Sequence, residues 1–271
     1  MYLETVDKFA ELAAARTNFL KSHPAGFFIS SMMAGIYVGL GIILIFCLGN
    51  DIDPSLRRLV MGTSFGIALT LVMFAGSDLF TGLTMFMTHG VLQKRASLGD
   101  LGRVWALSWL GNLAGSVLVA ALFSAAGGGG LLFGKSTFLF DVATAKMTAP
   151  PLALFARAIL CNWLVCLALW SASRVTSDAA KCILIFWCLF AFIGSGYEHS
   201  VANMTLLSLA LLGNHPESVT VGGMITNLLW VTLGNTVSGA LFMGVGYWYA
   251  SRSRVTACAH RAPSLVAQGA K

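Results

Sequence analysis

Six long apolar stretches restrict the possible folds of this chain more than any other feature. An α-helix rises 1.5 Å per residue, so about 20 apolar residues are needed to cross the roughly 30 Å hydrocarbon layer of a membrane. The stretches cover residues 26–48, 57–89, 103–126, 152–173, 181–213 and 219–250. The sequence therefore predicts an all-α membrane protein with six transmembrane helices.

Composition excludes two large classes of protein. Of the 271 residues, 57% are apolar and only 10% are charged, whereas a soluble domain carries about 25% charged residues. The basic residues stand singly and form no patch with interleaved aromatic residues, so we expect no nucleic-acid partner. The partner that this composition favours is a lipid bilayer.

Three parts follow from the pattern along the chain. Residues 1–25 mix charged and apolar residues at near-helical spacing, which predicts an N-terminal amphipathic helix on the membrane surface. Residues 26–250 form the six-span transmembrane domain, and the polar residues 251–271 predict a disordered cytoplasmic tail. With both termini cytoplasmic, twelve Lys and Arg residues face the cytoplasm and five face the other side, in agreement with the positive-inside rule.

The second and fifth stretches are too long to be simple spans. Each has about 33 residues and would extend roughly 50 Å as a straight helix. Glycine and polar residues interrupt both, in Ala-Gly-Ser-Asp-Leu-Phe-Thr-Gly at 75–82 and Ile-Gly-Ser-Gly-Tyr-Glu-His-Ser at 193–200. Irregular backbone at membrane depth is tolerated only where it is buried in protein or lines a wet cavity. We therefore expect helices 2 and 5 to be broken.

The two breaks indicate an internal repeat. Both contain Gly-Ser, and aligning these dipeptides places Thr81 opposite His199. The tripeptide Leu-Gly-Asn also recurs, at 110–112 and 233–235. Three spans per copy turn the second copy upside down, an inverted-repeat plan in which broken helices meet near the midplane and form a transport site. The repeat thus predicts a permeation protein.

His199 is the strongest candidate for chemistry. An ionisable side chain at membrane depth is costly unless its site is wet or paired. The alternative is a neutral imidazole that is hydrogen-bonded between helices, but the break and the pairing with Thr81 favour function. Neutral histidine donates a hydrogen bond to an anion, and protonated histidine releases a proton, so His199 suits a weak-acid anion. For Thr81, a hydrogen bond to its own backbone is an equal alternative.

Asp78 and Glu198 lie beside the breaks. A carboxylate in an anion pore would repel the solute, so we expect each to accept backbone N–H groups and to hold the shape of its break. The positive ends of the half-helices after the breaks favour an anionic solute.

Other polar and bulky residues offer weaker signals. Asn203 lies on the same helical face as His199 and can bond either the break or the solute. Asn162 lies in the fourth span, and Lys146 precedes it; a lysine there more often extends toward lipid headgroups. Four bulky residues flank the breaks and are either core or a constriction of a pore: Phe65, Leu69, Leu79 and Phe192.

An enzymatic alternative is an intramembrane serine protease, since Ser195 and His199 are both present. They lie in one segment, however, and the other candidate base, His89, is near a loop, so we expect no enzyme. The six cysteines are scattered without zinc spacing, so we expect no metal site and no cofactor.

Four segments together resemble the formate/nitrite transporter family over residues 5 to 250: residues 75–81, 160–168, 196–204 and 229–235. The resemblance implies a homopentamer in a bacterial inner membrane, with one aquaporin-like pore in each protomer. It implies nitrite as the solute, linked to protons, with formate or hydrosulfide as alternatives.

The resemblance also implies roles for individual residues. It places His199 at the centre of the pore, with Thr81 facing it and with Asn162 and Lys146 as further polar contributors. Two constrictions would be formed by Phe65, Phe192, Leu69 and Leu79. One departure from the family pattern is Asp78, where we expect glutamate in most relatives.

Overall fold

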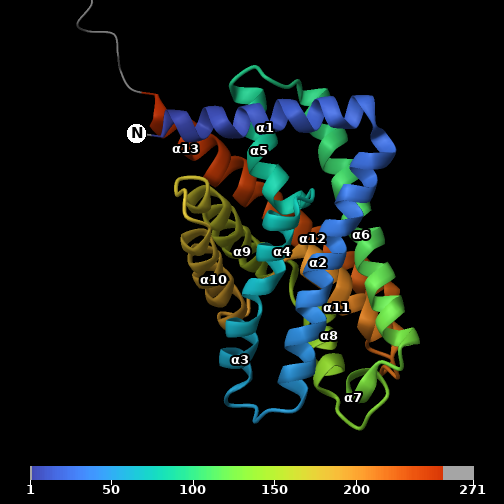
Figure 1. Ribbon diagram of the computed structural model, residues 1–271. Coiled ribbons are helices and arrows are strands. Elements are labelled where there is room, and N and C mark those ends of the chain that lie inside the picture. The colour runs from blue at the N-terminus through green and yellow to red at the C-terminus, as the bar shows by residue number, and fades with distance from the viewer. Residues whose placement is uncertain (1, 253–271) are drawn as a thin grey trace, which may run out of the picture.

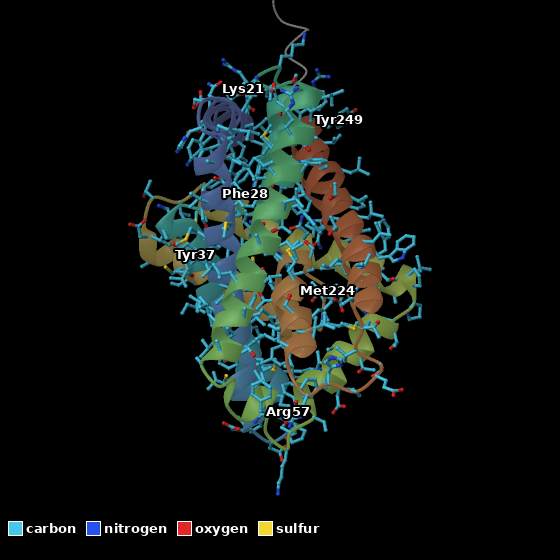
Figure 2. The ribbon with its side chains drawn as sticks, turned by 90° about the vertical axis from the view of Figure 1, so that its right-hand side faces the viewer. Lys21, Phe28, Tyr37, Arg57, Met224 and Tyr249 are labelled. Atoms are coloured by element: carbon cyan, nitrogen blue, oxygen red, sulfur yellow. The ribbon has the colours of Figure 1, made fainter. Side chains whose placement is uncertain are left out.

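The computed structural model describes residues 2–252, and every regular element in this range is a helix. Figure 1 shows the long helices running side by side, with α1 lying across one end. Figure 2 places Lys21 and Tyr249 near that end and Arg57 at the opposite end. The predicted all-α fold is confirmed. From residue 253 onwards, the tail that we expect to be disordered lies outside the described residues.

The helices follow the predicted stretches closely. In chain order they are α1 Leu3–Ser22, α2 Pro24–Asn50, α3 Arg57–Ser64, α4 Gly66–Ala75, α5 Phe80–Leu92, α6 Leu98–Ala125, α7 Gly129–Leu132, α8 Phe138–Thr148, α9 Pro151–Ala172, α10 Asp178–Gly194, α11 Ser200–Leu212, α12 Val221–Val237, the π-helix η1 Ser238–Val245 and α13 Gly246–Ser251.

Five helical stretches within residues 2–252 are long and apolar enough to cross a membrane: Pro24–Asn50, Arg57–Ala75, Leu98–Ala125, Pro151–Ala172 and Val221–Ser251. The stretch predicted at 181–213 is divided between α10, with 17 residues, and α11, with 13. The number of spans therefore stays a prediction.

Both breaks occur where the sequence places them. Helix α4 ends at Ala75 and is followed by Gly76, whose φ of 76° is the left-handed conformation that glycine adopts without strain. The second break contains Gly196 with a φ of 70°. Leu79 and His199 are extended and lead directly into α5 and α11. A further interruption at Phe65, between α3 and α4, is not predicted by the sequence.

Helix α1 is amphipathic. It buries Val6, Phe9 and Ala13 against the bundle and exposes Glu4 and Glu11. Charged residues thus face away from the apolar contact, as expected of residues 1–25. The location of this helix on a membrane surface stays a prediction.

Two pairs of helices approach closely through glycine. A Cβ on Gly115 of α6 would overlap the carbonyl oxygen of Met32 on α2, and a Cβ on Gly234 of α12 would overlap that of Phe155 on α9. Small residues allow such close backbone contact between membrane helices. The contacts bring α6 and α12, which carry Asn112 and Asn235, against the two breaks.

Candidate functional site

Two wide cavities and a narrow one between them mark the candidate site. The cavity beside α1, here called the α1 vestibule, has a volume of about 240 Å³ and is lined by residues that include Lys8, Arg16 and Asp78. The cavity beside α8, the α8 vestibule, has about 330 Å³ and is lined by Arg57, Arg58 and Lys146 among others.

The narrow central cavity shares lining residues with both vestibules. Its volume is about 10 Å³, the space of roughly one water molecule. Leu69 and Leu79 line it together with the α1 vestibule, and Phe192 and His199 line it together with the α8 vestibule. Phe65 also lines the central cavity, and its ring meets that of Phe192 edge-on at 5.4 Å between centroids. The four bulky residues thus line the narrowest of three neighbouring cavities.

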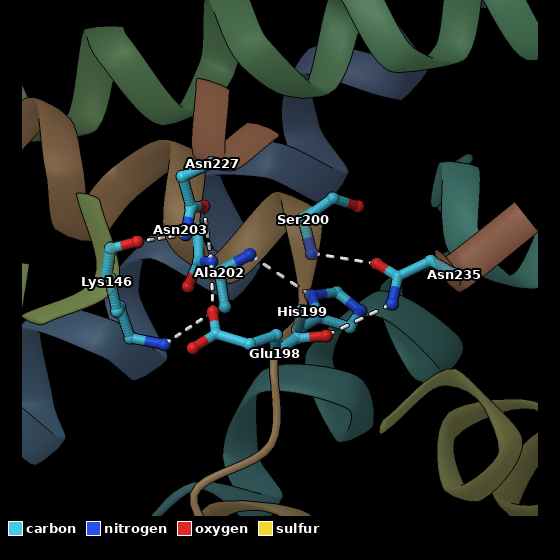
Figure 3. Close-up of polar contacts among 8 residues, drawn as sticks. All are labelled: Lys146, Glu198, His199, Ser200, Ala202, Asn203, Asn227 and Asn235. Carbon is cyan, nitrogen blue, oxygen red and sulfur yellow. Dashed lines mark hydrogen bonds and ion pairs between the residues drawn. The ribbon is translucent and has the colours of Figure 1, made fainter. Parts of the chain in front are cut away.

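The hydrogen bonds of His199 define its tautomer. As N-cap of α11, its Nδ1 accepts a bond from the Ala202 backbone N–H at 3.1 Å (Figure 3). A ring nitrogen that accepts carries no proton, so the proton of the neutral imidazole is on Nε2. Nε2 lies 3.1 Å from the Thr81 hydroxyl oxygen. The predicted pairing of Thr81 with His199 is therefore a hydrogen bond in which His199 donates.

Asn162 lies behind Thr81 and lines none of the three cavities. Its amide nitrogen donates to the Thr81 carbonyl oxygen at 3.3 Å and to the Asn235 carbonyl oxygen at 2.7 Å. Asn162 is buried, so its place supports the start of α5 and offers no direct contact with a solute from the cavities.

Asn112 and Asn235 close the two breaks, although neither is among the site residues predicted from the sequence. Asn112 Oδ1 accepts from the Phe80 backbone N–H at 2.9 Å, and its amide donates to the Asp78 carbonyl oxygen at 3.0 Å. Asn235 repeats this at the other break: Oδ1 accepts from the Ser200 N–H at 2.8 Å, and the amide donates to the Glu198 carbonyl oxygen at 3.1 Å. The sequence feature that marks both asparagines is the tripeptide Leu-Gly-Asn, which recurs at 110–112 and 233–235.

The prediction that Asp78 and Glu198 accept backbone N–H groups at the breaks is wrong. Within residues 2–252, no backbone N–H donates to the carboxylate of Asp78 or Glu198. Neutral Asn112 and Asn235 instead accept from the backbone N–H groups at the breaks. An amide provides both acceptor and donor, so it bonds an N–H and a carbonyl together, which a carboxylate cannot do.

Glu198 instead belongs to a buried polar network (Figure 3). Its Oε2 forms an ion pair with Lys146 Nζ at 2.8 Å and accepts from the Asn203 amide at 2.6 Å. Asn203 also donates to Asn227 Oδ1 at 2.8 Å, and Asn227 donates to the Lys146 carbonyl oxygen at 3.0 Å. Lys146, expected to extend toward headgroups by residue type, is 17% exposed at its side chain and faces the α8 vestibule.

Asp78 pairs with a corresponding cation, Arg16, which is not among the site residues predicted from the sequence. Arg16 Nε of α1 lies 2.7 Å from Asp78 Oδ1, and the Ser30 hydroxyl donates to Oδ2 at 2.7 Å. The Asp78 side chain is only 1% exposed. Each break thus has a buried carboxylate that pairs with a cation from the helix before a long apolar helix, α1 or α8.

Comparison with known proteins decides the family. The model for formate/nitrite transporters matches residues 3–249. The chain belongs to the formate/nitrite transporter family. The nitrite transporter NirC of Escherichia coli is 59% identical over 251 residues, which cover 93% of each chain.

Solved structures agree with this assignment. A formate/nitrite transporter family ion channel matches with a TM-score of 0.90 and 57% identity, over 92% of this chain and all of that one. A pentameric formate channel with formate bound matches with a TM-score of 0.72 and 26% identity, over 85% and 98% of the two chains. The predicted channel fold is thereby confirmed. These relatives are named as transporters and channels, not as enzymes.

Proposed function

We propose that this protein is a membrane channel for nitrite, a small monovalent anion of a weak acid. The observation that carries the proposal is the position of His199, which lines both the central cavity and the α8 vestibule. Its Nε2–H, which donates to the Thr81 hydroxyl in this structure, is the hydrogen-bond donor that an entering anion would take over from Thr81. The 59% identity to a nitrite transporter supports nitrite over other small anions.

Electrostatics favour an anion in both vestibules. Arg57, Arg58 and Lys146 line the α8 vestibule, and Lys8 and Arg16 line the α1 vestibule. Helices α5 and α11 begin next to the central cavity, and a helix N-terminus carries a partial positive charge. Cations would be repelled at each of these places.

We further propose that permeation is linked to protons. The apolar constrictions leave an anion almost no water, and removing water from a charge costs many kcal/mol, whereas neutral nitrous acid avoids this cost. His199 donates at Nε2; to pass on a proton, Nδ1 must exchange the Ala202 N–H for a proton from water. The rival mechanism is a plain anion channel that uses hydrogen bonds alone.

His199→Asn tests the mechanism. Asparagine also caps helices, so α11 keeps its start, but it carries no titratable proton. In vesicles that report nitrite uptake, internal pH and membrane current together, we expect nitrite flux to become an anion current without coupled protons. Unchanged proton coupling in this variant would rule out the role of His199. His215→Asn, the same change at an exposed residue, should behave as the wild type.

Formate and hydrosulfide are the alternative solutes within the family. Nitrite and formate are both small, bent and rich in acceptors, so a path that admits one should admit the other. In a competition assay in vesicles, we expect nitrite uptake to be inhibited more weakly by formate than by unlabelled nitrite. Stronger inhibition by formate or hydrosulfide would reassign the solute.

For the whole assembly, we propose a homopentamer of six-span protomers in a bacterial inner membrane, with both termini cytoplasmic and one aquaporin-like pore in each protomer. The solved pentameric formate channel supports the number of copies. The matching roles of Asn112 and Asn235 support two inverted three-helix repeats. The α1 vestibule would then face the cytoplasm, with α1 on the membrane surface.

A further inference from the structure

Arg16 contributes positive charge to the α1 vestibule, but the proposed permeation mechanism gives its individual N–H groups no role. Its side chain is 34% exposed, and it lines the α1 vestibule together with Leu69 and Leu79, which also line the central cavity. An anion held by Arg16 would therefore lie next to the narrow part of the path.

An ion pair holds the guanidinium on one side. Its Nε lies 2.7 Å from Asp78 Oδ1, and Asp78 is itself held by the Ser30 hydroxyl at 2.7 Å. Within residues 2–252, Arg16 Nη1 and Nη2 form no hydrogen bond, and the ion pair with Asp78 is made through Nε. The two terminal nitrogens thus remain as donors within a vestibule of about 240 Å³.

A guanidinium with two such donors matches one kind of ligand. Its terminal N–H groups form parallel hydrogen bonds to a planar anion with two oxygens, a geometry that a lysine ammonium cannot reproduce. Nitrite and formate both have this shape. Chloride and hydrosulfide do not, since each presents a single acceptor atom.

The other cations of the α1 vestibule have partners already. Lys8 donates to the Ser173 carbonyl oxygen at 3.2 Å, and Lys181 pairs with Asp178 at 2.8 Å. At the α8 vestibule, Lys146 is bonded to Glu198. Arg16 therefore offers the vestibules a type of contact that these lysines do not.

We propose that Arg16 is an anion-binding residue that holds a planar, two-oxygen monovalent anion through Nη1 and Nη2 at the mouth of the α1 constriction. The proposal rests on the proposed nitrite function and extends it with a second binding site, on the side opposite the α8 vestibule. Asp78 acts here as a positioning residue that orients Arg16 from behind.

The experiment measures nitrite flux against nitrite concentration from each side of an oriented membrane that contains the purified full chain. In Arg16→Gln, we expect the half-saturating concentration on the α1 side to rise about five- to twentyfold, since a charge-assisted pair of hydrogen bonds is lost. The value from the α8 side should stay within twofold. Arg95→Gln removes an exposed cation outside the lining of the α1 vestibule and should match the wild type.

Arg16→Lys separates the paired donors from the charge. Lysine keeps the ion pair with Asp78, so this variant should fold even if Arg16→Gln does not. We expect its half-saturating concentration on the α1 side to rise at least threefold for nitrite and formate and to stay unchanged for chloride or hydrosulfide, if these pass. Wild-type values for nitrite in Arg16→Lys would overturn the proposal.

Two further outcomes are informative. If Arg16→Gln raises the maximal flux and leaves the half-saturating concentration unchanged, the ion pair between Arg16 and Asp78 restricts flux and does not bind the anion. This result would also overturn the proposal. If the wild type shows no saturable nitrite flux, the proposed function itself is contradicted. If the wild-type flux is saturable and Arg16→Gln has the wild-type half-saturating concentration, only the site at Arg16 is contradicted.

Discussion

At the scale of residues, the site depends on side chains that bond the backbone of the two breaks. The His199 ring has its proton on Nε2 because Nδ1 accepts from the Ala202 N–H, and Ser200 is held by Asn235. The ring nitrogen of His199 that carries the proton is thus determined by a backbone N–H group three residues away. A substitution at Asn235 should therefore alter the position of His199 indirectly, because Asn235 bonds the backbone of both its neighbours, Glu198 and Ser200.

Asn235→Ala provides a test at this scale. The change removes three hydrogen bonds and leaves the buried Ser200 N–H and the Ala158 and Glu198 carbonyls without this partner. A buried polar group without a partner costs about 1–3 kcal/mol. We expect the folded protein to lose at least this much stability, measured as a lower temperature of unfolding in detergent. Asn214→Ala, at an exposed residue, should leave that temperature unaltered; equal effects of both changes would contradict the assigned role.

At the scale of elements, close helix contacts determine where the polar residues lie. Helix α6 packs against α2 at Gly115, and this contact keeps Asn112 beside the first break. The sequence predicted the breaks, because glycine and polar residues interrupt apolar stretches visibly. It did not predict α8 or its effect on Lys146, since a short helix in a connecting segment has no comparable pattern.

The same contacts give opposite expectations for two glycines of α6. A Cβ at Gly115 would overlap Met32 O, whereas a Cβ at Gly102 meets nothing within 4 Å. Gly115→Ala should therefore destabilise the fold by about 1–3 kcal/mol through overpacking. Gly102→Ala should be neutral or stabilise it by up to about 1 kcal/mol through helix propensity. Thermal unfolding of both purified variants compares the two, and a stabilising Gly115→Ala would show that α2 and α6 pack less closely.

At the scale of the whole molecule, the outer surface of the bundle is strongly apolar. Trp163 and Phe242 stack at 4.8 Å between centroids and remain about 40% exposed, and Trp187 is 60% exposed. Lipid or neighbouring copies must cover such residues. How many copies assemble cannot be predicted from this pattern, because lipid and a second protomer present similar apolar surfaces. The ion pairs of Arg16 and Lys146 could not be predicted from the sequence either, since each joins residues that are distant along the chain.

The proposed number of copies has a direct measurement. A closed ring uses two different faces of each protomer, so its assembly should have a single size. Native mass spectrometry of the protein in detergent should give five copies of the 28.7 kDa chain. A predominant monomer or dimer under conditions that preserve nitrite transport would exclude the pentamer.

On the proposed path, the central cavity limits how a solute can move. With room for roughly one water molecule, it admits a single small occupant that has shed most of its hydration shell. Solutes would then cross this part of the proposed path one at a time. The rate of crossing should reach a plateau as the solute concentration rises. Hydrated ions such as sodium should be excluded, because the cost of dehydration prevents them from entering the cavity.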